Sequence, residues 1–366
     1  MNKAKHIAWI DHARTLTMLL VIIGHCTYTK LMTQYGGIDY FDDVSPSDYS
    51  FSWKILCLIV AFIYSFHMPL FMMLSGACFR LGIKKTNGFM ALINNKCHRL
   101  LIPFFLTTLL LSVPLKYLGG YYNESEHVME DILLGQFLLM GNSHLWFIVS
   151  LFWIFILFYG LYKVNITEKR WLLPFLILLS LIASYLNELH LEFLGIILAF
   201  KHLVYFSIGF IYLNRLDSSK MGGVKMTVHF ICLIILFVVY WKFGHDNDII
   251  IKCFHYIQSI IMGIYGSFVM IQFSKAIETK RCITESKFYK TFSRYSYDFY
   301  LFSDPFNYVL IYIMTVYFGV FVIGNVTSLT AFFVRFVGSI VFAYAIILIK
   351  NKIQEFRNIN GTIRKS

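Results

Sequence analysis

Ten long apolar segments separated by short charged loops constrain this chain of 366 residues more than any other feature. About 20 apolar residues cross the hydrocarbon core of a membrane as a helix, which satisfies its backbone hydrogen bonds internally. With 58% hydrophobic and 14% charged residues, the sequence predicts an all-α integral membrane protein, a single bundle of about ten transmembrane helices. The expected spans are 12–30, 54–79, 99–118, 144–162, 171–188, 193–213, 226–243, 249–274, 296–319 and 328–350.

The loops between these segments alternate in charge. Lys and Arg gather in every second loop and near both termini, whereas Asp and Glu gather in most of the others. Because cytoplasmic loops carry an excess of Lys and Arg, the alternation predicts that both termini are cytoplasmic. Topology therefore explains the net charge of +12, and the sequence favours the lipid bilayer as a partner and not nucleic acid.

The rest of the chain gives no sign of a second domain. No internal repeat, low-complexity segment or appended soluble domain is visible, so we expect residues 1–366 to form one membrane domain. The seven cysteines are scattered and form no CxxC or Cys/His cluster, so neither a disulfide framework nor a metal site is predicted. The oligomeric state cannot be predicted from these features.

The first apolar segment carries three ionisable side chains, Asp11, Arg14 and His25. On a helix that turns by 100° per residue, Arg14 and His25 lie within about 20° of each other around the axis and about 16 Å apart along it. Asp11 falls within about 60° of both. Ionisable residues inside membrane spans usually mark functional paths. A cation near one surface and a histidine deeper on the same face suit a substrate that enters end-on.

Polar residues also interrupt the second and third spans. His67 and Pro69 favour a broken helix in the second span, and the Ser75-Gly76 pair permits close backbone approach. Farther on, cations at helix ends are expected either to bind phosphate groups or to anchor the helices among lipid headgroups. These cations are Arg80, Lys96 and Arg99.

The later spans contain further polar side chains at membrane depth. Lys201 and Arg335 are expected to line a cavity or to reach outward to the surface. Asp298 and Asp304 need partners or water at this depth, and Arg14, Lys201 and Arg335 are the candidates. Beside His144, Trp146 is also compatible with an ordinary position in the aromatic belt at the membrane surface.

Several of these stretches together resemble the acyltransferase-3 family of membrane-bound acyltransferases, including its branch named for fucose 4-O-acetylase. The matching residues are Asp11-x-x-Arg14 followed by ten residues and His25, Phe66-His67-Met68-Pro69-Leu70-Phe71 with Ser75-Gly76, Arg99-Leu100-Leu101-Ile102-Pro103, and His144-Leu145-Trp146-Phe147. The chain also departs from the family. Relatives usually have a histidine where this sequence has Ser303, followed by Asp304, and they commonly have two arginines before the third span, where this sequence has Lys96 and Arg99.

The resemblance implies transfer of an acyl group, most often acetyl, from cytoplasmic acyl-CoA to a hydroxyl of a cell-envelope sugar or glycolipid. The location implied is the bacterial cytoplasmic membrane, with multiple passes. The expected catalytic residues are His25 as general base, which the usual histidine pKa of about 6.5 suits, with Arg14 and Asp11. Residues expected to bind the acyl-CoA donor are Arg14, Arg80, Lys96 and Arg99. Residues expected to bind the acceptor are His67, His144, Trp146 and Asp304.

Two alternatives stay open at this point. A covalent acyl-histidine step is compatible with the same residues as direct transfer. A polytopic transporter or flippase for envelope glycolipids would also explain ionisable groups inside the membrane and a broken helix, but such a protein does not require a base at His25.

Overall fold

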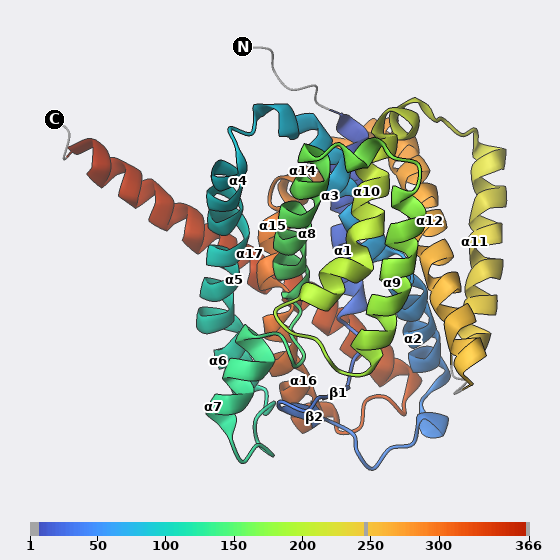
Figure 1. Ribbon diagram of the computed structural model, residues 1–366. Helices are drawn as coiled ribbons and strands as arrows, with labels where there is room; N and C mark the ends of the chain where they lie inside the picture. The colour runs from blue at the N-terminus through green and yellow to red at the C-terminus, as the bar shows by residue number, and fades with distance from the viewer. Residues whose placement is uncertain (1–6, 245–247, 364–366) are drawn as a thin grey trace.

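The computed structural model describes residues 7–244 and 248–363, and almost all of its regular structure is helical (Figure 1). The first half contains α1 (Ala8–Gly24), β1 (Lys30–Met32), β2 (Gly37–Asp39), α2 (Phe51–Tyr64), α3 (His67–Gly82), α4 (Phe89–Lys96), α5 (Ile102–Thr107), α6 (Val113–Leu118), α7 (Val128–Glu130) and α8 (Trp146–Lys163). The second half contains α9 (Leu172–Glu188), α10 (Ile196–Ser218), α11 (Gly223–Phe243), α12 (Ile249–Glu278), α13 (Arg281–Thr284), α14 (Lys287–Arg294), α15 (Ser296–Phe302), α16 (Pro305–Phe318) and α17 (Asn325–Ile363). The two strands form a small antiparallel hairpin.

Within the described part of the chain, seven helical segments are long and apolar enough to cross a membrane. Two of them are composite. One joins α2 to α3, and the other runs from α4 to α6 through π-helical turns at Cys97–Leu101 and Thr108–Ser112. The helices α9 and α16 are apolar but shorter, and α1, with 17 residues, carries charged side chains in its first turns. The prediction of an all-α membrane protein is thus confirmed, whereas the count of ten spans and the side of each terminus stay predictions.

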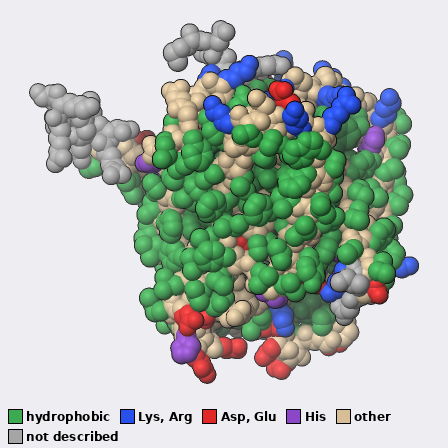
Figure 2. All heavy atoms as spheres, in the orientation of Figure 1, with side chains coloured by type: hydrophobic (Ala, Val, Ile, Leu, Met, Phe, Trp, Pro, Cys, Tyr) green, Lys and Arg blue, Asp and Glu red, His purple; other side chains and the backbone are tan. Residues whose placement is uncertain are grey.

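Charged side chains gather at the two ends of the bundle and leave a broad apolar belt between them (Figure 2). We call the end near α4 and α14 the basic end, and the end near α7 and the hairpin the acidic end (Figure 1). Exposed residues of the basic end include Lys84, Lys85, Lys280, Arg281, Lys287 and Lys290. Exposed residues of the acidic end include Asp42, Asp43, Asp48, Glu124, Glu126 and Glu130.

Helix α1 lies inside the bundle, where it contacts α2, α3, α12, α14, α15 and α17. It ends earlier than the expected span 12–30, because donors from other helices satisfy the carbonyl groups of its last turn. The Tyr64 hydroxyl donates to the Gly24 carbonyl at 2.9 Å, and Arg335 donates to the His25 carbonyl at 2.7 Å. His25 itself is the C-cap of the helix, and its backbone angles stay in the helical region. It therefore keeps the position on the helix face that the sequence predicted.

The second span breaks where the sequence predicted, between Tyr64 at the end of α2 and His67 at the start of α3. The His67 ring contacts the Ile63 carbonyl through Nδ1 at 3.0 Å and so supplies a partner for one carbonyl group at the break. Pro69 falls in the first turn of α3, where a missing N–H removes no helical hydrogen bond. Farther along, Gly76 lies directly against the backbone of Phe206 in α10, so the expected close approach is confirmed.

Candidate active site

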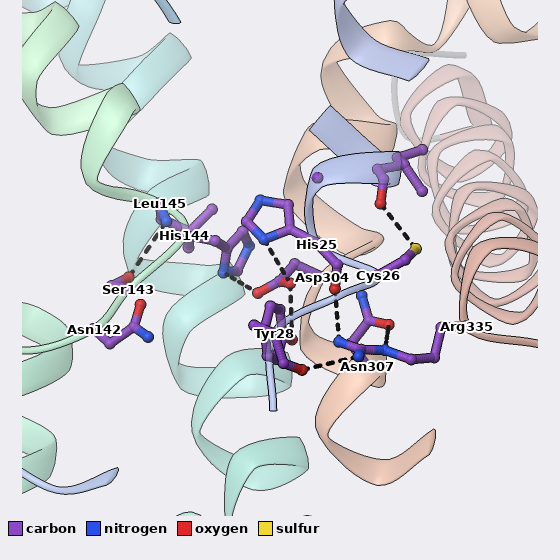
Figure 3. A network of polar contacts seen from close by, with 12 residues as sticks. His25, Cys26, Tyr28, Asn142, Ser143, His144, Leu145, Asp304, Asn307 and Arg335 are labelled. Atoms are coloured by element: carbon purple, nitrogen blue, oxygen red, sulfur yellow. Dashed lines mark hydrogen bonds and ion pairs between the residues drawn. The ribbon is translucent and has the colours of Figure 1, made fainter. Parts of the chain in front are cut away.

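The site is built around the end of α1, where His25 meets the junction between α15 and α16 (Figure 3). Asp304 lies at that junction with only 3% of its side chain exposed. Its Oδ1 lies 3.1 Å from His25 Nδ1 and also accepts a hydrogen bond from the Tyr28 hydroxyl at 3.1 Å. A carboxylate beside Nδ1 favours the tautomer with its proton on that nitrogen, which leaves Nε2 with a free lone pair. The arrangement therefore prepares His25 to accept a proton at Nε2.

Arg335 of α17 holds the backbone on which His25 stands. Its side chain is fully buried, and its guanidinium donates to the carbonyl groups of His25 at 2.7 Å and Tyr28 at 2.9 Å (Figure 3). Its Nε also donates to Asn307 Oδ1 at 3.3 Å. A cation at the C-terminal end of a helix interacts favourably with the helix dipole. Arg335 thus fixes the turn after α1, and with it the direction of the imidazole.

His144 lies beside His25 and approaches the other oxygen of the Asp304 carboxylate (Figure 3). Its Nδ1 lies 3.4 Å from Asp304 Oδ2, while its Nε2 contacts the Leu301 carbonyl at 3.3 Å. The backbone of His144 is held as well, because the Tyr300 hydroxyl donates to its carbonyl. One carboxylate therefore contacts two imidazoles whose ring centres lie 6.5 Å apart, although they come from segments more than one hundred residues apart in the sequence.

Lys116 of α6 fixes the loop that leads to His144. Its ammonium group is buried, donates to Gln136 Oε1 at 2.8 Å, and also donates to the Asn142 carbonyl. It lies 4.3 Å from the centre of the Tyr121 ring. A buried ammonium group with these partners is satisfied without a carboxylate in direct contact.

Three cavities follow α1 from the basic end towards His25. The basic-end cavity, of about 530 Å³, is lined by Arg14, Lys96 and Arg99 among others. The middle cavity, of about 380 Å³, is lined by the same three cations and by Tyr300. We call the third the histidine cavity; it measures about 470 Å³ and also has Tyr300 in its wall. Its polar lining includes His25, His67, His144, Lys201, His202 and Asp304. Arg14 and His25 thus line successive cavities that meet at Tyr300.

A family model described as an acyltransferase domain matches residues 7–348, nearly the whole chain and every element of this site. The chain belongs to the acyltransferase-3 family. It is therefore a membrane acyltransferase, and the transporter alternative is not favoured. No curated protein and no solved structure shows a significant match. The fucose 4-O-acetylase branch stays a prediction.

The acyltransferase brings together most of the residues that the sequence singled out. Asp11 forms an ion pair with Arg14 on the first turns of α1, and this contact orients the guanidinium. His67 and Trp146 line the histidine cavity together with His25. Both the predicted acceptor residues and the predicted base therefore face one space.

Arg80 lies elsewhere. Its Nη1 donates to the carbonyl groups of Phe210 and Ile211, each at 2.8 Å, and so ties α3 to α10. It does not line the basic-end or the middle cavity as the described residues define them. We therefore leave Arg80 out of the predicted donor site, for which Arg14, Lys96 and Arg99 stay predictions.

The partners expected for Asp298 and Asp304 were wrong. Asp298 pairs with Lys350 of α17 at 2.5 Å, and Asp304 contacts His25 and His144 instead of an arginine or lysine. Lys350 ends the last expected span, where a lysine ordinarily anchors a helix at the membrane surface. For that reason its sequence position gave no sign of this contact.

Three residues of the site were not identified from the sequence. Tyr28 and Tyr300 are tyrosines within or next to apolar segments, where such residues are common. Lys116 lies near the end of an expected span and has the pattern of a lysine that reaches the surface. Its place two residues before the end of the expected span 99–118 therefore gave no sign of a buried site residue.

Proposed function

We propose that this acyltransferase moves an acyl group, with acetyl as the expected one, from cytoplasmic acyl-CoA to a hydroxyl of a cell-envelope sugar or polysaccharide precursor. The observation that carries the proposal is the line of three cavities, which has cations at one end and His25 backed by Asp304 at the other. The positive-inside rule makes the basic end the cytoplasmic end. A donor with a phosphate-rich head would then enter from the cytoplasm.

The charges at the basic end suit the phosphate groups of CoA. Arg14, Lys96 and Arg99 line both the basic-end and the middle cavity, and an arginine fork can bind a phosphate through two parallel hydrogen bonds. The pantetheine arm is long and thin, so it fits a passage that follows one helix. In this arrangement the thioester lies near Tyr300, where the middle cavity meets the histidine cavity.

In the proposed reaction, His25 Nε2 removes the proton from the acceptor hydroxyl as that oxygen attacks the thioester carbonyl carbon. A carbon–oxygen bond forms, the carbon–sulfur bond breaks, and the proton passes from His25 to the departing thiolate. Asp304 stabilises the imidazolium that forms in between, because its carboxylate lies 3.1 Å from Nδ1. The base is regenerated when the thiol leaves.

Replacement of His25 by alanine tests the chemical step. We expect transfer from labelled acetyl-CoA to a membrane glycan extract to fall by about 10²-fold or more, the usual contribution of a general base. His12→Ala is the matched control, since His12 lies on the same helix but contacts Tyr289 at 2.6 Å and lines none of the three cavities. Full transfer by the His25 variant would remove His25 from the role of base.

Replacement of Arg14 by alanine tests the donor end. We expect weaker binding of acetyl-CoA and little change in acceptor binding, because Arg14 lines only the cavities on the basic side of Tyr300. Arg170→Ala removes an equal charge from an exposed position and controls for the overall field. Equal affinity for acetyl-CoA in the wild type and the Arg14 variant would exclude Arg14 from the donor site.

A further inference from the structure

Lys201 has a position that the proposed reaction does not use. It lies five residues after the start of α10, is half-buried, and lines the histidine cavity together with His25. Among the described residues, its ammonium group forms no hydrogen bond and no ion pair. The sequence left open whether this lysine lines a cavity or reaches outward, and the structure directs it to the cavity.

The cavity offers Lys201 no counter-ion. Asp304 is the only carboxylate in the described lining, and it already contacts His25, His144 and Tyr28. An ionised amine at membrane depth is costly unless an opposite charge or water accompanies it. A ligand that carries an anion would supply the missing charge.

Glu192 is an acid outside the cavity lining whose charge acts on Lys201. Its Oε2, however, accepts a hydrogen bond from the Leu198 amide at 3.0 Å, in the first turn of α10. Burial raises the pKa of Glu192 to about 7, so at neutral pH the carboxyl is only partly ionised. It lies outside 4 Å of the ammonium group and is a weak substitute for a direct partner.

The rest of the cavity has the character of a sugar site. The Trp146 ring lies 5.3 Å from the His202 ring, and the His202 ring lies 6.0 Å from the Tyr205 ring. All three residues line the cavity. Flat aromatic faces pack against the C–H faces of sugars, while imidazole and phenol groups can bond hydroxyl groups. The volume of about 470 Å³ falls within the usual range for small-ligand sites.

We propose that Lys201 binds an anionic group, a carboxylate or a phosphate, on the acceptor, so that this acyltransferase acts on an acidic glycan or glycolipid. The inference rests on the proposed function, because it takes the histidine cavity as the acceptor site. The anion belongs to the acceptor and not to the donor, since the cations suited to CoA phosphates line the cavities on the other side of Tyr300. Lys201 would then select among acceptors by charge, while His25 acts on the hydroxyl.

Three methyl glycosides that differ in one group test the proposal. Methyl glucoside is neutral, methyl glucuronoside carries a carboxylate, and methyl glucoside 6-phosphate carries a phosphate. Their binding to the full chain in phosphatidylcholine nanodiscs is measured by calorimetry. We expect one anionic glycoside to bind at least tenfold more tightly than methyl glucoside. The tighter of the two identifies the anion as a carboxylate or a phosphate.

Variants then assign the preference to Lys201. In Lys201→Met, the dissociation constants of the three glycosides should lie within about twofold of one another. Lys201→Arg should retain most of the preference for the anionic glycoside. Lys225→Met is the matched control, because it removes the same charge from an exposed position at the start of α11 and should change nothing. Retention of the preference in Lys201→Met would overturn the proposal.

The remaining outcomes of the binding experiment also test the proposal of an acidic acceptor. Equal binding of the three glycosides to the wild type, or no binding of any of them while acetyl-CoA still binds, would overturn the acidic acceptor and leave the donor site intact. Loss of acetyl-CoA binding as well would instead count against the proposed function. If phosphatidylglycerol in the nanodisc abolishes the preference, the anion bound by Lys201 is a lipid headgroup, and the assignment to the acceptor fails.

Discussion

Replacing Asp304 by asparagine removes the charge that faces His25 while the size of the side chain is almost unchanged. In the proposed reaction the imidazole gains positive charge as it takes the hydroxyl proton. The carboxylate oxygen lies 3.1 Å from Nδ1, and at an effective dielectric constant of about 20 two full charges at that distance attract by about 5 kcal/mol.

If about half a charge develops on the imidazole in the transition state, the variant loses about 2–3 kcal/mol of stabilisation at this step. By the usual relation between barrier and rate, that loss lowers kcat by about 10²-fold. Acetyl-CoA binding should not change, because Asp304 lines only the histidine cavity. The reasoning thus predicts an effect on kcat that is separate from donor affinity.

The assay is single-turnover transfer from labelled acetyl-CoA, with acetyl-CoA affinity measured in parallel. Asp298→Asn is the matched control, since Asp298 pairs with Lys350 and lines none of the three cavities. It should change kcat by less than about threefold. A rate for Asp304→Asn within threefold of the wild type, or an equal loss in both variants, would refute the electrostatic argument.

Two further predictions concern stability. Gly76→Ala should destabilise the protein by about 1–3 kcal/mol, because the new Cβ would meet the backbone of Phe206. In the control Gly82→Ala, in the same helix, the new Cβ has no atom within 4 Å, so this variant should be neutral or mildly stabilised. Thermal denaturation of both variants in one detergent measures the difference, and equal melting temperatures would contradict the prediction. Glu192 has a pKa of about 7 in the folded protein, above its unfolded value of about 4.5, so its stabilising contribution is complete below pH 4.5 and is lost as pH rises through 7. After allowance for solvent screening, raising the pH from 6 to 8 should lower the free energy of unfolding by up to about 1 kcal/mol. Melting temperatures measured across this pH range should show the decrease in the wild type, and this part of the pH dependence should be absent in Glu192→Gln.

The sequence predicted what depends on local pattern. Hydropathy located several of the apolar helices, because a membrane helix must be apolar over its whole length. The bounds of α8, α9 and α11 agree with expectation within about three residues. The break before His67 and the pairing of Asp11 with Arg14 are equally local, since a proline and a three-residue spacing determine them.

Such local patterns could not predict contacts between segments that are far apart in the sequence. Asp304 lies 279 positions after His25, and no periodicity in either segment indicates that they meet. Arg335 could have compensated an acid, but it instead bonds the carbonyl groups at the end of α1. Which of several buried charges face each other depends on how helices pack, and the sequence of each helix alone does not contain that information.

The hydrogen bonds from Arg335 to the end of α1 also bear on how the protein is made. The first helix leaves the ribosome more than three hundred residues before Arg335 is synthesised, so a nascent chain already carries the histidine long before the group that orients it. The carboxylate at Asp304 likewise arrives late. An incomplete chain in the membrane therefore has the proposed donor-binding cations, but it lacks both the carboxylate and the guanidinium that position the proposed base.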